Sequence, residues 1–75
     1  MDEDTAYAWA SRALVALNRN PPKGWVAQGI TMISQEIDYF NPKTKRHKTY
    51  SFVETENGLR VLGGKNGPVD VPYEV

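Results

Sequence analysis

The chain has 75 residues with no cysteine and a single histidine, and its 9 Lys and Arg residues balance its 9 Asp and Glu residues. A chain of this length buries only about 60% of the surface that its unfolded form exposes, so it fits one domain with a small core. Disulfides are excluded, and the zero net charge gives no overall attraction to nucleic acid or to a membrane. We expect a single small domain, residues 1–75, without a cofactor or a metal.

The chain has no run of residues long and apolar enough to span a membrane. Its N-terminus is acidic and lacks the basic segment that begins a signal peptide. The absence of cysteine is compatible with a reducing compartment. We therefore expect a soluble cytoplasmic protein that does not bind membranes.

Residues 4–18 have the pattern of an α-helix. Asp4 is the expected N-cap, because its carboxylate can accept hydrogen bonds from the first helical turn. Two prolines, Pro21 and Pro22, prevent the helix from continuing. The expected buried face is a stripe of apolar residues at helical spacing: Tyr7, Ala10, Leu14 and Leu17.

Residues 25–40 fit two different elements. The apolar residues at positions 26, 30, 33, 37 and 40 are spaced like one face of a helix. The isoleucines and aromatic residues favour a strand instead. A Pro-led turn sequence at 41–45 follows and suits a hairpin, so we favour a strand over about 29–40 and keep the helix as the alternative.

Two further strands, 48–56 and 59–62, flank the pair Asn57-Gly58. This pair predicts a type I′ hairpin turn with positive φ at both residues, and a register that places Glu54 opposite Val61. Residues 69–71 form an expected edge strand between two prolines. The shared core face of the hairpin should carry Tyr50, Phe52, Leu59 and Val61.

These elements predict an α+β fold, in which one N-terminal helix packs on a three- to four-stranded antiparallel β-meander. At least one sheet edge is then available for pairing, which would allow a homo-oligomer.

The hairpin tip at 43–48 carries a basic cluster, and two aromatic residues follow it on one face of the next strand. A positive hairpin tip beside Tyr50 and Phe52 is typical of a phosphate-binding and base-stacking surface. The alternative is a solvated turn beside core aromatics. The basic candidates for partner binding are Lys43, Lys45, Arg46 and Lys48.

Trp9 and Trp25 are the other candidate binding residues, because tryptophan is enriched at protein-binding hot spots. The alternative is that both shield a thin core. Exposure of the two rings on one surface would indicate a protein-binding face.

The only histidine, His47, lies in the basic turn, and no metal-ligand or nucleophile spacing surrounds it. The carboxylates of Glu36 and Asp38 are expected to pair with Lys48 or Arg46 across the hairpin. We therefore expect no catalytic residues and no enzymatic activity.

The sequence favours a small protein-binding module, an adaptor or inhibitor that acts on a larger macromolecular partner. The alternative is a nucleic-acid-binding domain that uses the basic tip 43–48 and the neighbouring aromatic residues.

Overall fold

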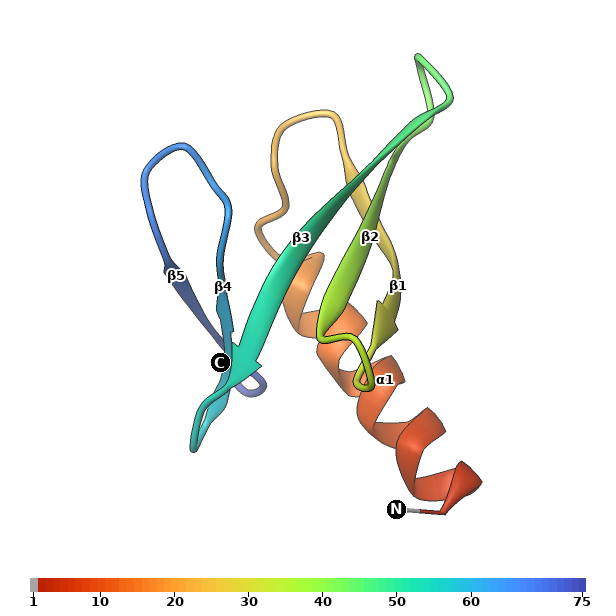
Figure 1. Cartoon of the computed structure of the whole chain (residues 1–75), viewed down its shortest axis with the longest axis vertical. Helices are drawn as coiled ribbons and strands as arrows, with labels where there is room; N and C mark the ends of the chain where they lie inside the picture. The colour runs from red at the N-terminus through yellow and green to blue at the C-terminus, as the bar shows by residue number, and fades with distance from the viewer. Residues whose placement is uncertain (1) are drawn as a thin grey trace.

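The computed structural model describes residues 2–75, which form one helix and five antiparallel strands (Figure 1). The strands follow one another in the order β1-β2-β3-β4-β5, so the sheet is a meander. The α+β class with an N-terminal helix is confirmed, although the sheet has one strand more than the largest number expected. The elements are α1 Glu3–Leu17, β1 Val26–Thr31, β2 Glu36–Asn41, β3 Arg46–Glu54, β4 Gly58–Val61 and β5 Val69–Pro72.

The additional strand arises because residues 29–40 do not form one strand. They contribute to two strands, β1 and β2, which a turn at 32–35 connects. The helix alternative for residues 25–40 is therefore also wrong. This turn contains neither glycine nor proline, and Gln35 takes a φ of 55°. Ile33, one of the apolar residues of the helical pattern, is 98% exposed in the turn.

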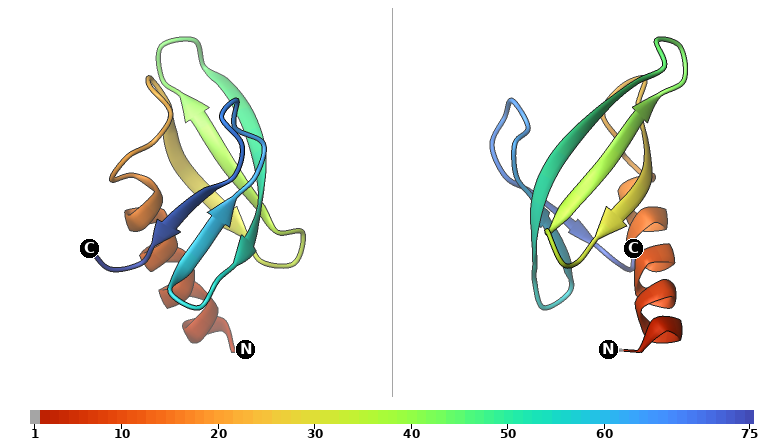
Figure 2. Two further views of the ribbon diagram at one scale, coloured as in Figure 1. Left: turned by 90° about the vertical axis from the view of Figure 1, so that its left-hand side faces the viewer. Right: turned by 45° about the vertical axis from the view of Figure 1, so that its right-hand side comes forward.

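The sheet bends along β3. The first part of this strand pairs with β2, from Arg46 opposite Asn41 to Ser51 opposite Glu36. Its last residues pair with β4, where Phe52 lies opposite Val61. The outer strands β1 and β5 both contact α1, so the helix lies across the open side of the bent sheet (Figure 2).

The core contains residues of the helix and of strands β1 to β4, together with Tyr73, which directly follows β5. The largest fully buried side chains are Phe52, Ile37 and Leu59. The helix is rotated relative to the expected face, since Tyr7 is 75% exposed and Leu14 is only partly buried. Its buried residues are Ala13, Ala16 and Leu17. Small alanine side chains let the helix backbone approach the sheet.

The N-cap of α1 is Asp2, and the expectation for Asp4 is wrong. The carboxylate of Asp2 accepts a hydrogen bond of 2.7 Å from the backbone N–H of Thr5. This contact lowers the pKa of Asp2 below its ordinary value. Asp4 instead lies in the first turn, near the positive end of the helix dipole.

The β3–β4 hairpin exists, but its predicted turn type and register are wrong. Glu54 pairs with Leu59, and neither Asn57 nor Gly58 has a positive φ. The turn at 55–57 is closed by a hydrogen bond of 2.9 Å from the N–H of Thr55 to the carbonyl of Gly58. The expected edge strand is confirmed as β5, which pairs with β4 and places Gly58 opposite Pro72.

The end of α1 covers part of both sheet edges. The side-chain amide of Asn18 donates to the carbonyl of Ala27 and accepts from its N–H, at 2.8 and 2.9 Å. The guanidinium of Arg19 donates to the carbonyls of Pro72 and Tyr73. These contacts occupy backbone groups that a free edge would offer to another chain.

Candidate binding groove

A groove of about 610 Å³ opens between the end of α1, the middle of β3 and the loop that precedes β5. We call it the lysine groove. Its lining residues are Leu17, Asn20, Pro21, Pro22, Lys23, Trp25, Tyr39, Lys48, Tyr50, Val61, Gly64, Lys65, Asn66, Gly67, Val69 and Val71. A volume of this size is typical of ligand pockets, which span about 300–1,000 Å³.

Trp25 and Tyr50 are partly buried in the groove and share one cation. The ammonium of Lys48 lies 4.4 Å from the centroid of the Trp25 ring and 4.9 Å from that of Tyr50. Tyr50 also packs edge-on against Tyr39, with the ring centroids 5.3 Å apart. Cation–π contacts of this kind hold the Lys48 side chain along the wall of the groove.

Local backbone structure places these side chains. Lys48 and Tyr50 are two residues apart on β3, so they point to the same face of the sheet. A turn precedes Trp25, closed by a hydrogen bond of 2.9 Å from its N–H to the carbonyl of Pro22. Gly24 in this turn has a φ of 87°, a conformation that favours glycine.

The groove is basic. Lys23, Lys48 and Lys65 line it, and no Asp or Glu residue does. The three ion pairs found among residues 2–75 involve no lysine. The groove therefore presents several ammonium groups without a carboxylate partner.

The fold separates charges that balance in the sequence. The loop at 18–25, the turn at 42–45 and the loop at 62–68 lie at one end of the molecule (Figures 1 and 2). The start of α1 and the turn at 55–57 lie at the opposite end. The first group of segments carries Lys23, Lys43, Lys45 and Lys65, and the second carries Asp2, Glu3, Asp4 and Glu56. Arg19, at the start of its loop, instead bonds to the carbonyls of Pro72 and Tyr73.

The two tryptophans do not share a surface. Trp9 packs against Phe52, with ring centroids 6.0 Å apart, and its indole N–H donates to the hydroxyl of Tyr73 at 2.8 Å. It lines no part of the lysine groove. Of the two candidates, Trp25 alone belongs to this site, and Trp9 belongs to the packing between helix and sheet.

The four basic candidates lie in two different places. Lys48 enters the groove, whereas Lys43, Lys45 and Arg46 are exposed at the hairpin tip. Phe52 is buried, which excludes it from a base-stacking surface. Sequence reasoning missed Lys23 and Lys65. The position of Lys23 two residues before Trp25 was a usable signal, but the Gly-rich loop around Lys65 gave none.

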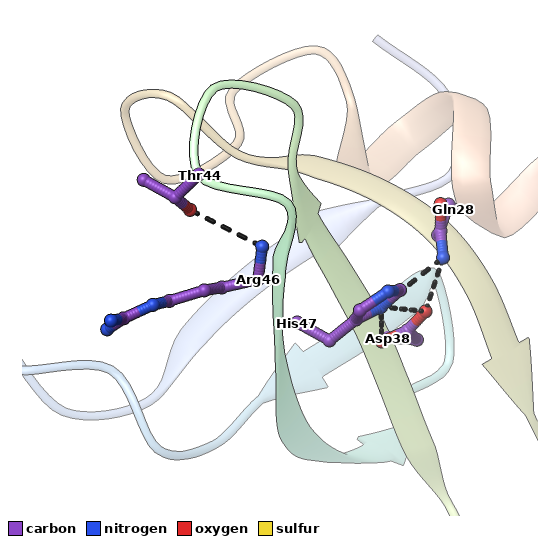
Figure 3. Close-up of polar contacts among 5 residues, drawn as sticks. All are labelled: Gln28, Asp38, Thr44, Arg46 and His47. Carbon is purple, nitrogen blue, oxygen red and sulfur yellow. Dashed lines mark hydrogen bonds and ion pairs between the residues drawn. The ribbon is translucent and has the colours of Figure 1, made fainter.

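The outer face of the sheet carries a polar cluster (Figure 3). His47 lies 3.1 Å from the carboxylate of Asp38, so the expected pairing of Asp38 with Lys48 or Arg46 is wrong. Gln28, at a bulge in β1, donates to the same carboxylate at 2.7 Å. This bond, with a smaller contribution from His47, lowers the pKa of Asp38. His47 and Arg46 extend to opposite sides of β3.

Within residues 2–75, no group of three or more His, Asp or Glu side chains is arranged to hold a metal ion. No helix in this part of the chain is both long enough and apolar enough to cross a lipid bilayer. No protein-family model matches the chain, and no curated protein or solved structure matches it. The lysine groove is therefore the feature on which a functional proposal can rest.

Proposed function

We propose that the chain is a small, non-enzymatic protein-binding module that takes a segment of a larger partner into the lysine groove. The observation that carries the proposal is the open, partly buried pair Trp25 and Tyr50. Partly exposed aromatic side chains in a groove are the usual anchors of protein interfaces. Both adaptors and inhibitors use such surfaces.

The shape of the groove supports a peptide segment as the ligand. Pro21 and Pro22 stiffen one wall, and a Gly-containing loop forms another. Aromatic-lined grooves on small sheet domains commonly dock extended peptide segments. The sole histidine contacts Asp38 on the outer face of the sheet and is not among the groove residues, which favours binding over acid–base chemistry.

A displayed library of random peptides tests the proposal directly. The Trp9→Phe variant serves as bait, because Trp25 is then the only tryptophan and its emission reports on the groove. We expect selected peptides to change the emission of Trp25 and to lose at least about tenfold in affinity for a Trp25→Ala variant, a loss of about 1.4 kcal/mol.

The matched control is Tyr7→Ala, which removes an aromatic side chain that is 75% exposed on α1. It should bind the selected peptides like the parent protein, and circular dichroism should show that the Trp9→Phe bait and the Trp25→Ala and Tyr7→Ala variants are all folded. The proposal would be contradicted if no peptide is selected, or if every selected peptide binds the bait and the Trp25→Ala variant with equal affinity.

Nucleic-acid binding is the second candidate, and the separation of charge favours it. The exposed cations of the hairpin tip and the cations of the groove lie on neighbouring segments of one end of the molecule. Phosphate contacts from such cations give strongly salt-dependent affinity. The double reversal Lys45→Glu with Arg46→Glu should abolish binding to labelled DNA or RNA, measured by fluorescence anisotropy. Tight, salt-sensitive binding that this reversal removes would place the second candidate first.

A further inference from the structure

We infer that the ligand of the lysine groove is an acidic, extended peptide segment whose carboxylates pair with Lys23, Lys48 and Lys65. This inference rests on the proposed function and names the chemistry of the partner. The three lysines line one hollow whose lining includes no Asp or Glu residue. A ligand with two or three acidic side chains supplies the missing charge.

Electrostatic complementarity is the first reason for an acidic ligand. The cations of a concave site add their potentials, which speeds association with an anion and rejects a cation. The acidic start of α1 lies at the far end of a molecule that is 35 Å long. Because charges further apart than about 8–10 Å are largely screened at physiological salt, these acids do not cancel the field at the groove.

The position of Lys48 is the reason for a peptide rather than a single-stranded nucleic acid. Its ammonium covers one face of both Trp25 and Tyr50. A base that stacked on this face would have to displace the cation, which makes base stacking on the pair less favourable. A carboxylate instead reaches the ammonium while Lys48 keeps its aromatic contacts, and an apolar ligand side chain can pack on the rest of Trp25.

The form of the groove is the reason for an extended segment. A second hollow of about 270 Å³ shares Leu17, Asn20, Val69 and Val71 with the lysine groove. The two hollows are therefore neighbours beside β5, and Arg19 and Asp70 also line the second one, where Asp70 pairs with Arg60. A segment in extended conformation can reach from one hollow to the other with alternate side chains facing the protein.

The composition of the selected peptides tests the inference separately from the proposed function. Peptides that depend on Trp25 and are enriched in Asp and Glu are the expected result. Peptides that depend on Trp25 but are neutral or basic would overturn the inference and leave the proposed function standing. Failure to select any peptide that depends on Trp25 would overturn both.

A comparison of three ligands then measures how much the negative charge of the peptide contributes to binding. One selected acidic peptide, its Gln-substituted form and a labelled oligothymidylate of equal length are titrated by fluorescence anisotropy. We expect the acidic peptide to bind at least about tenfold more tightly than its Gln form, with an advantage that shrinks as salt rises. Equal binding of the two peptides, or preferred binding of the oligothymidylate, would overturn the inference.

The double variant Lys23→Glu with Lys65→Glu should lose at least about tenfold in affinity for the acidic peptide. The matched control, Lys43→Glu with Lys45→Glu, makes the same change of charge at the hairpin tip and should lose less than about threefold. Equal losses in the two variants would mean that only the overall charge of this end matters. That result would contradict a ligand seated in the groove. If the unliganded protein sediments as a polymer and the Lys23→Glu with Lys65→Glu variant does not, a second copy, with its acidic start of α1, is the occupant, and the inference is overturned.

Discussion

Position 58 requires glycine because a neighbouring strand lies close to it, and not because of the conformation of its own turn. A Cβ atom at this position would lie 2.0 Å from the carbonyl oxygen of Val71 and 2.7 Å from the Cα atom of Pro72. Both atoms belong to the backbone of β5 and cannot move without disturbing the β4–β5 pair. Close approach of two strands therefore explains the glycine, although its φ is not positive.

We predict that Gly58→Ala lowers the free energy of unfolding by about 1–3 kcal/mol, because the added methyl group forces β5 away from β4. Gly64→Ala is the matched control, since a Cβ atom there makes only an ordinary contact of 3.7 Å. Its effect should stay within about 0.5 kcal/mol. Urea denaturation of both variants measures the difference, and equal midpoints would contradict the close approach.

Asp38 provides a prediction about pH. Its pKa is lowered first by the hydrogen bond from Gln28 and then by His47, so the ionised carboxylate is favoured in the folded state. Its stabilising effect is present above the unfolded pKa of about 3.9 and is lost as the pH falls through the lower folded value. Carboxyl NMR titration should show a midpoint below the ordinary range, and Gln28→Ala should raise it. An unchanged midpoint would show that the Gln28 contact is absent in solution.

At the scale of the element, the helix shows how residue size selects the buried face. The expected stripe through Tyr7 and Leu14 has larger side chains than the face through Ala13 and Ala16. The observed rotation places these two alanines against the sheet and buries Leu17 to 3% exposure. Helical spacing alone allowed both faces, because Leu17 belongs to each of them.

We predict that Leu17→Ala destabilises the protein by about 2–5 kcal/mol, because it leaves a cavity between helix and sheet. Tyr7→Ala should change the free energy of unfolding by less than about 0.5 kcal/mol, since that side chain is mostly in solvent. Thermal or urea unfolding separates the two outcomes. If Tyr7→Ala destabilised the protein more than Leu17→Ala, the buried face of the helix would be the one expected from the spacing.

At the scale of the whole molecule, Tyr73 joins the ends of the chain. Its hydroxyl accepts a hydrogen bond from the Trp9 indole N–H, its ring centroid lies 4.5 Å from the Arg12 guanidinium carbon, and its backbone N–H donates to the carbonyl of Asn57. Its carbonyl also accepts from Arg19. One residue therefore contacts the middle of α1, the segment just after α1 and the β3–β4 turn, and these contacts hold the bent sheet against the helix.

We predict that Tyr73→Phe costs about 1 kcal/mol, the usual loss when a partly buried hydrogen bond is removed. Tyr73→Ala should cost about 3 kcal/mol or more, because it also removes a buried ring. Chemical denaturation followed by circular dichroism gives both values. Similar, small losses for both variants would mean that the C-terminal residues do not hold the helix to the sheet.

The arrangement of charge is also a property of the whole molecule. The chain is neutral, but its loops gather lysines around the groove and leave acidic residues at the other end. Zero net charge therefore does not exclude a site that attracts anions. The binding predictions above depend on this local field and not on the total charge.

The sequence by itself determined the features that depend on near neighbours along the chain. Helical spacing and the prolines at 21 and 22 located α1, the Asn-Pro sequence located the turn at 42–45, and proline-bounded residues located β5. The turn at 32–35 escaped prediction because it has no glycine or proline, and an apolar residue, Ile33, occupies it.

The tertiary structure alone decided the buried helix face, the register of the β3–β4 hairpin, the reason for Gly58 and the composition of the site. Each of these depends on which distant segments meet. Trp25, Lys48 and Lys65 come from three different parts of the chain, and only the bending of the sheet along β3 and its closure by α1 bring them to one groove. Local spacing carries no signal for such contacts, because the free energy that selects them comes from packing between elements.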